Sequence, residues 1–129
     1  SIIMFDESNM SKFIENSICC ICEHLGISTV ILISSNIEKT PDLTKDDRVI
    51  DICKRLNADT YINAIGGRDL YAQDKFAQNG LSLGFIKTGE IIYKQFNDSF
   101  VPGLSILDVM MFNSPETIST MLDNYSIIK

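Results

Sequence analysis

The chain has 129 residues, of which 45% are hydrophobic and 22% are charged, and its formal net charge is −6. That length supplies one domain with a buried core, and that composition belongs to globular proteins and not to disordered chains. An acidic chain without a Lys/Arg cluster suits neither a nucleic-acid backbone nor an anionic membrane, so we expect no nucleic-acid or membrane partner.

The first predicted helix spans residues 9–25. Its apolar residues recur at helical spacing and form one stripe, made of Met10, Phe13, Ile14, Ile18, Ile21 and Leu25. Gly26 is a natural stop for this helix. Cys19, Cys20 and Cys22 lie within one of its turns and cannot all cross-link distant segments, so we expect no disulfide framework. A reducing, cytoplasmic location fits this cysteine pattern best.

The first predicted strand spans residues 28–34. This run is continuous and β-branched, as in a strand that is covered on both faces. Ser34 and Ser35 stand at its C-terminal end, at the sheet edge where ligand crevices form in α/β proteins. Their other role is to satisfy backbone groups of the loop, so both interpretations stay open.

A second helix and a second strand follow. Thr44 caps the helix and makes a capping-box-like pair with Asp47. Asn57 supplies the left-handed residue that ends the helix. The second strand is expected over residues 60–64, directly before a turn that contains two glycines.

The middle of the chain predicts a weakly patterned helix over residues 68–78, stopped by an Asn-Gly pair, and a third strand over residues 81–87. In that strand Leu81, Leu83 and Phe85 share one face. Helices and strands that alternate with short connections are typical of a parallel sheet with right-handed crossovers.

The C-terminal part predicts helices. Ser105 and Asp108 form a capping box before residues 106–112. Ser114 caps a final helix, which has Pro115 at its first position, where proline is well suited.

The predicted fold class is α/β: a three-layer arrangement of a small, mostly parallel sheet flanked by helices, with a helical C-terminal tail. A hairpin through Thr88 and Gly89 is the alternative to the last parallel step. We expect residues 1–129 to form a single domain. Three strands are half of a doubly wound domain, so we expect a missing N-terminal part or self-association to complete the sheet.

The turn after the second strand is the strongest candidate for a ligand site. Gly66 and Gly67 would let backbone N–H groups approach a phosphate or carboxylate at the start of the next helix. Asn63 and Arg68 flank the turn, and the Arg68 guanidinium suits an anion that accepts two hydrogen bonds. The alternative is a tight turn that only needs positive φ, since the full G-x-G-x-x-G spacing is absent.

A second polar group lies nearer the C-terminus. Tyr93 and Gln95 would share one face of an extended segment, as a ligand contact or as a polar strand face. Ser105 and Asp108 are further ligand candidates beside their capping role. No metal site is expected, because the acidic residues of the second helix are already stabilised by the helix dipole. The sequence identifies neither a catalytic residue nor a cofactor.

Four phrases of the chain carry a family resemblance: ICEHLGI, YINAIGGRDLY, FAQNGLSLGFIK and IIYKQFNDSFVPGLSILDVMMFNS. Together, over residues 18–125, they resemble the C-terminal part of the WbqC-like protein family. The last block is the most specific, because Tyr93 and Gln95 followed by LSILDVMMFN do not form a general α/β pattern. The family's N-terminal part, with its Gln-Pro-Tyr-Phe-like stretch, is absent, so half of the family's polar set is expected to lie outside this chain.

The resemblance implies a role in bacterial surface-polysaccharide synthesis, such as that of O-antigen or capsule. The implied activity is that of a transferase on an activated sugar or nucleotide-linked substrate, and this fragment alone is expected to be inactive. The layout is also similar to that of nucleotide-binding ligases and nucleotidyltransferases of the pantothenate-synthetase type, which is an analogy of fold only. The alternative is a non-catalytic interaction or assembly module.

Overall fold

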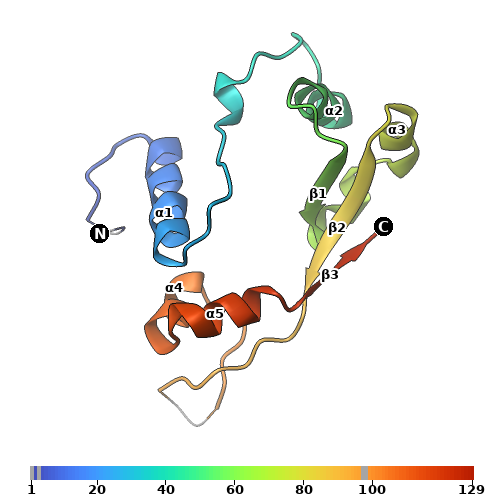
Figure 1. Cartoon of the computed structure of the whole chain (residues 1–129). Coiled ribbons are helices and arrows are strands. Elements are labelled where there is room, and N and C mark those ends of the chain that lie inside the picture. The colour runs from blue at the N-terminus through green and yellow to red at the C-terminus, as the bar shows by residue number, and fades with distance from the viewer. Residues whose placement is uncertain (1, 3, 97–98) are drawn as a thin grey trace. The chain divides into compact units, whose positions relative to one another are not determined.

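The computed structural model describes residues 2, 4–96 and 99–129. Contacts within the chain divide it into two compact units (Figure 1). Unit 1 comprises Ser1–Leu32 and Glu90–Asp123, and unit 2 comprises Ile33–Gly89 and Asn124–Lys129. The expectation of a single domain stays a prediction.

Unit 2 is built on a three-stranded sheet in the order β1-β2-β3 (Figure 1). β1 (Thr60–Ala64) runs parallel to β2 (Ser82–Thr88), and β2 runs antiparallel to β3 (Tyr125–Ile128). The predicted parallel step between the first two of these strands is therefore confirmed, but the sheet is mixed and not mostly parallel. The hairpin alternative is wrong, because residues 90–95 form no strand and β3 pairs with β2 instead.

Two helices supply the rest of the core of unit 2. α2 (Lys45–Arg55) and α3 (Gln73–Gln78) both contribute buried side chains. The buried cluster combines these helices with β2 and the residue before it, and consists of Ile50, Cys53, Phe76, Leu81, Leu83 and Phe85. The predicted shared face of the third strand is confirmed, since Leu81, Leu83 and Phe85 are each at most 5% exposed. Burial raises the pKa of the Cys53 thiol.

The opposite face of this sheet stays open. Ile62 and Ile127 point away from the buried cluster and are 50% and 44% exposed. Gly84 lies between them on β2, where an added Cβ would come within 2.8 Å of Ile127 Cγ2. Within the described residues of unit 2, the buried side chains of the helices join the face of Leu83 and Phe85, so the expected three-layer arrangement is not confirmed.

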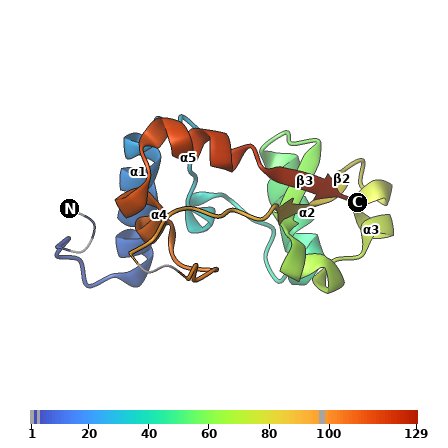
Figure 2. The ribbon, with the colours of Figure 1, turned by 90° about the horizontal axis from the view of Figure 1, so that it is seen from below.

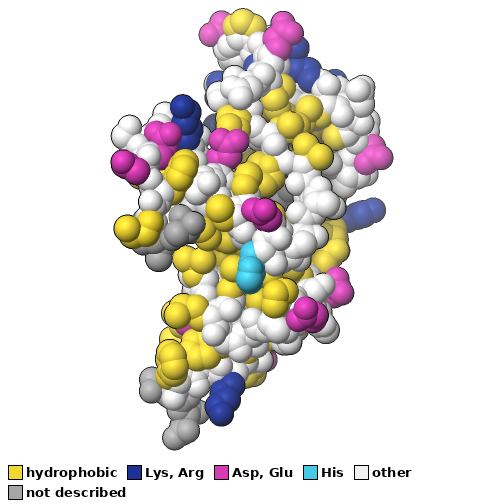
Figure 3. Space-filling view, turned by 60° about the vertical axis from the view of Figure 1, so that its left-hand side comes forward, with side chains coloured by type: hydrophobic (Ala, Val, Ile, Leu, Met, Phe, Trp, Pro, Cys, Tyr) yellow, Lys and Arg dark blue, Asp and Glu magenta, His cyan; other side chains and the backbone are white. Residues whose placement is uncertain are grey.

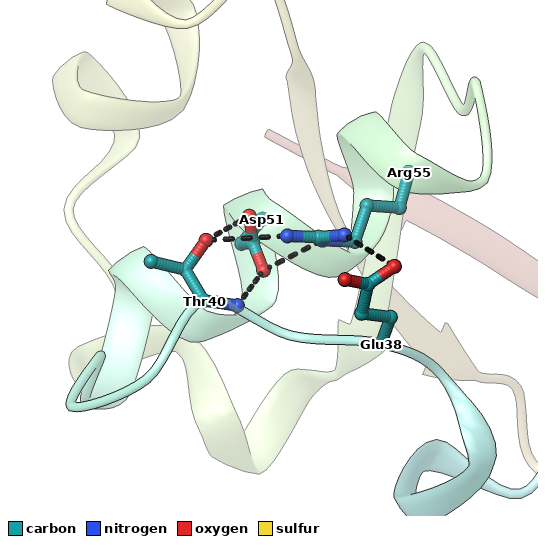
Figure 4. A network of polar contacts seen from close by, with 4 residues as sticks. All are labelled: Glu38, Thr40, Asp51 and Arg55. Carbon is teal, nitrogen blue, oxygen red and sulfur yellow. Dashed lines mark hydrogen bonds and ion pairs between the residues drawn. The ribbon is translucent and has the colours of Figure 1, made fainter.

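A polar network holds the segment before α2 onto that helix (Figure 4). The carboxylate of Asp51 accepts hydrogen bonds from the backbone N–H and the hydroxyl of Thr40, both at 3.0 Å. Arg55 donates to Asp51 at 3.0 Å and forms a longer ion pair of 3.7 Å with Glu38. The backbone hydrogen bond from Thr40 lowers the pKa of the Asp51 carboxyl. The network fixes the path by which the chain enters α2.

Unit 1 contains α1 (Met10–His24), α4 (Ile106–Phe112) and α5 (Pro115–Leu122), and Figure 2 shows α4 and α5 side by side. α1 begins where Asn9 accepts a hydrogen bond from the backbone of Lys12 and ends before Gly26, whose φ is 68°. These bounds confirm the predicted first helix. Across the described residues, no helix combines the length and the apolar character that a membrane crossing requires.

The strand predicted over residues 28–34 is wrong. Residues 27–33 have no regular secondary structure, and Ser34–Asn36 form a short 3-10 turn, η1. Val30 is 79% and Leu32 is 55% exposed. A β-branched run becomes a strand only when a neighbour supplies hydrogen bonds, and no described strand pairs with this run.

The helix predicted over residues 68–78 is broken in two. Ile65–Leu70 form a 3-10 turn, η2, and α3 begins only at Gln73. Tyr71 between them is extended, with φ −126° and ψ 136°. Its ring packs against Tyr61 and Phe76 at centroid distances of 5.5 and 5.9 Å, and these contacts hold the interruption in place. Gly80, with φ 74°, follows α3 as predicted.

The ends of the other helices follow the predicted residues with two corrections. Ser105 and Ser114 both cap their helices through the hydroxyl, at Leu107 and Thr117. Thr44 makes no side-chain capping bond, so the expected pair with Asp47 does not form. The predicted helical tail also ends in a strand, β3, which the four-residue apolar pattern was too short to reveal.

Candidate functional site

A pocket of about 340 Å³ lies in unit 2 and is lined by Lys45, Asp46, Asp69, Leu70 and Tyr71. Two of these residues come from the first turn of α2, and three come from the segment that follows β1 through its glycine turn. The predicted turn therefore leads directly into the wall of a pocket. A concave surface with mostly apolar lining and a few polar groups is the usual form of a small-molecule site.

Asp46 is the buried polar residue of this pocket, with 8% of its surface exposed. One carboxylate oxygen, Oδ2, accepts a hydrogen bond from the backbone N–H of Ala72 at 3.2 Å. A carboxylate in the first turn of a helix is also stabilised by the helix dipole. These two interactions explain how a charged group is kept inside unit 2.

Lys45 precedes Asp46 in an unfavourable backbone conformation. Its φ is 48°, in the left-handed region that residues with a Cβ rarely adopt. Such a conformation costs about 1–3 kcal/mol and persists only where the surrounding structure holds it. The side chain of Lys45 is exposed, so its ammonium group stands at the rim of the pocket.

Tyr71 joins the pocket to the core of unit 2. The hydroxyl of Tyr61 donates a hydrogen bond to the hydroxyl oxygen of Tyr71 at 3.3 Å, which leaves the proton of Tyr71 free for another acceptor. Burial, together with this hydrogen bond, raises the pKa of Tyr61 above its ordinary value. The Tyr61 ring also stacks on Phe76 at 5.7 Å, so the aromatic wall is anchored in the core.

The predicted turn residues lie beside the pocket and do not line it. Gly66 and Gly67 are inside η2 and not at the start of a long helix. Neither glycine has positive φ, so the alternative of a turn that needs glycine for positive φ is wrong. An added Cβ on Gly67 would lie 2.8 Å from Asn63 Nδ2, whereas Gly66 has open space. Asn63 accepts a hydrogen bond from the N–H of Ala64 at 2.8 Å, and Arg68 is exposed.

Ser34 and Ser35 form most of η1 and are exposed. Neither residue lines the pocket. With no strand before them, they do not stand at the end of a sheet, which was the reason for naming them. Among the described residues, no side-chain hydrogen bond joins either serine to the other candidates of unit 2.

Three candidates of unit 1 meet in one hydrogen-bonded cluster. Tyr93 donates to Asp108 Oδ2 at 2.6 Å, and this bond raises the pKa of Tyr93. Gln95 donates to both Tyr93 and Asp108, at 3.2 and 3.3 Å. Its amide also bonds the backbone of Val101 in both directions, at 2.8 and 3.1 Å. Ser105 caps α4 beside this cluster without bonding to it.

The hydrogen bonds of this cluster join the segment of Tyr93 and Gln95 to α4. The Gln95 amide pairs with Val101 as a neighbouring strand would, and so it closes the loop between them. Asp108 faces Tyr93 and Gln95, so it does not complete the capping box expected with Ser105. Most of the polar capacity of these side chains is therefore used within the cluster.

The pocket residues themselves were not among the sequence candidates. Tyr71 packs against other rings and Asp46 lies in the first turn of a helix, and both residues also line the pocket. The sequence feature that could have indicated three of them is their place in the chain, since Asp69, Leu70 and Tyr71 follow shortly after the glycine turn. No local pattern could reveal that Asp46 lies opposite them, because 23 positions separate it from Asp69 in the chain.

An α/β unit with a small pocket beside the turn after its first strand is compatible with many activities and identifies none of them. The chain belongs to the WbqC-like protein family, whose match covers residues 1–120. The family resemblance of the sequence is thereby confirmed over most of the chain. No curated protein and no solved structure matches the chain.

Proposed function

We propose that the chain is the ligand-binding part of a cytoplasmic WbqC-like transferase in bacterial surface-polysaccharide biosynthesis. Its ligand is a small molecule, an activated sugar or another nucleotide-linked substrate. The role in polysaccharide synthesis rests on the family resemblance and on family membership. A further segment of the family or a second copy of the chain completes the catalytic set, since neither the pocket nor the unit 1 cluster contains an activated nucleophile.

One observation carries the ligand-binding part of this proposal. The segment after β1 supplies Asp69, Leu70 and Tyr71 to a pocket that also holds the buried carboxylate of Asp46. Apolar surface with a few convergent polar groups provides both affinity and orientation for a small ligand. In this proposal, the hydrogen-bonded cluster of Tyr93, Gln95 and Asp108 stabilises the fold of unit 1 and does not bind the ligand.

Thermal-shift measurements on the chain with nucleotide sugars, ATP and acyl-CoA test the proposal. A nucleotide sugar is expected to raise the midpoint of thermal unfolding, because a ligand at one hundred times its dissociation constant stabilises the folded state by about 2.7 kcal/mol. Leu70→Arg is expected to abolish the shift, since Leu70 lines the pocket and is 69% exposed. Leu104→Arg is the matched control, at a half-exposed leucine outside the pocket. A chain that no nucleotide sugar stabilises would contradict the proposal.

The alternative is an interaction or assembly module, and exposed apolar side chains on α1 favour it. Met10, Ile14 and Ile18 lie four residues apart, on one side of the helix, and are 73%, 48% and 44% exposed. Hydrophobic side chains are also exposed at several places on the face shown in Figure 3. Light scattering separates the two functions: a chain that self-associates through α1, loses this association in Ile14→Lys and binds no nucleotide sugar is an assembly module.

A further inference from the structure

We infer that the pocket binds the sugar ring of the substrate through hydroxyl groups that donate to Asp46, and that it does not bind the phosphate groups. This inference rests on the proposed function and specifies which part of an activated sugar enters the pocket. It differs from the ligand that the sequence predicts for this region, which is an anion bound by Gly66, Gly67 and Arg68.

The first argument is the unused acceptor of Asp46. Ala72 donates to Oδ2, and Oδ1 has no hydrogen-bond partner among the described residues. In the described part of the chain, no buried side-chain oxygen lacks a partner. Oδ1 of Asp46 therefore keeps some solvent-accessible surface, although only 8% of the residue is exposed, and Asp46 lines the pocket. A carboxylate oxygen that has no partner within the protein is a strong acceptor for a hydroxyl donor.

The second argument is the sign of the charges around the pocket. Asp46 and Asp69 bring two carboxylates, and Lys45 brings one ammonium group, so the lining carries a net charge of 1 − 2 = −1. None of the three takes part in an ion pair within the described residues. Like charges within a few ångströms repel, and the repulsion grows when solvent is partly excluded. A phosphate is therefore disfavoured beside Asp46, whereas a neutral polyol is not.

The third argument is size and surface. At about 340 Å³ the pocket is near the lower end of the usual range for ligand sites, about 300–1,000 Å³. That volume suits a single sugar ring better than a complete nucleotide sugar. Leu70 and the Tyr71 ring offer apolar surface to the C–H groups of the ring, and the free proton of the Tyr71 hydroxyl can be donated to a ring or hydroxyl oxygen.

The decisive variant is Asp46→Asn. An asparagine keeps an oxygen for the N–H of Ala72 and turns an amide N–H₂ group toward the pocket, so it removes the acceptor for the sugar while keeping the structural hydrogen bond. Asp47→Asn is the matched control. Asp47 is the next residue of α2, is exposed, and is paired with Lys75 at 2.8 Å outside the pocket.

The measurement is a titration of the ¹⁵N-labelled chain, followed by NMR, with three sets of probes. These are hexoses and N-acetylhexosamines, nucleoside diphosphates, and the conjugates of the two. We expect the free sugars and the conjugates to shift the amide signals of Asp46, Asp69, Leu70 and Tyr71, and nucleoside diphosphates to leave them unchanged. Asp46→Asn is expected to weaken sugar binding about tenfold, and Asp47→Asn to leave it unchanged.

The possible results separate this inference from the proposed function. If the conjugates bind, nucleoside diphosphates compete with them and Asp46→Asn binds as tightly as the unchanged chain, the inference is overturned while the proposed function stands. If no probe of any set binds the folded chain, both are overturned. Amide signals of Asp46→Asn that match those of the unchanged chain away from the pocket verify that the variant is folded.

Discussion

Two neighbouring aspartates, Asp46 and Asp47, both lie in the first turn of α2 but have different surroundings. Asp46 is buried, accepts from the backbone of Ala72 and lines the pocket. Asp47 is exposed and forms an ion pair with Lys75, of the kind that contributes at most about 1 kcal/mol at a protein surface. The helix dipole favours both carboxylates, so only packing against the segment after β1 distinguishes their roles.

The two glycines of the turn are expected to respond differently to the same substitution. Gly66→Ala places its Cβ in open space and needs no positive φ, so it should stabilise unit 2 by up to about 1 kcal/mol by restricting the unfolded chain. Gly67→Ala brings a Cβ to 2.8 Å from Asn63 Nδ2, so the amide of Asn63 has to move and its hydrogen bond with Ala64 weakens.

Urea unfolding followed by circular dichroism compares these two variants. Gly67→Ala should unfold at a lower urea concentration than Gly66→Ala, with an unchanged slope. Equal midpoints would show that the approach of Asn63 to Gly67 places no requirement on that position. A loss of ligand binding in Gly67→Ala without a loss of stability would show instead that the turn contacts the ligand.

At the scale of elements, the short α3 is stabilised by the packing of its one buried residue, Phe76. A helix of six residues is not stable alone, since nucleation costs more than so few hydrogen bonds return. Phe76, with no exposed surface, joins α3 to the aromatic rings of Tyr61 and Tyr71 and to the buried cluster of the sheet. The pocket wall made by Tyr71 therefore depends on the same ring.

Phe76→Ala is expected to destabilise unit 2 by about 3–5 kcal/mol, because it leaves a cavity in the core. Phe96→Ala makes the same chemical change at a ring that is 89% exposed and should cost less than about 1 kcal/mol. Chemical unfolding of the two variants measures both values. If the two substitutions cost the same, Phe76 is not the residue that anchors α3.

At the scale of the whole molecule, the two units have unequal cores. Among the described residues, the buried hydrophobic side chains of unit 2 number six, and those of unit 1 consist of Ile118 alone. α1 and α4 have no buried residue. Since burial of apolar surface is the main stabilising contribution, unit 2 should open less often than unit 1.

Hydrogen exchange measures this difference directly. We expect the amide hydrogens in the centre of β2, around Leu83 and Phe85, to exchange most slowly, and those of α1 to exchange much faster. Mass spectrometry of peptic fragments provides both rates in one experiment on the intact chain. Equal protection of α1 and β2 would mean that unit 1 is as stable as unit 2 despite its small core.

Local patterns determined the elements that depend only on their own residues. The strand over residues 60–64, the caps at Ser105 and Ser114, and the glycine stops at Gly26 and Gly80 each appear where the sequence places them. The family could also be recognised from the sequence, because its most specific block is contiguous.

Tertiary structure alone decided the features in which distant segments meet. β3 forms because β2 offers it an edge, whereas residues 28–33, with a stronger strand pattern, have no described strand partner and stay irregular. The extended Tyr71 interrupts a helix because two rings hold it there. Asp46 becomes a pocket residue because Ala72 binds it from 26 positions away. Propensity and periodicity are properties of single segments. They do not include the free energy of a contact between two segments, and that free energy decided these features.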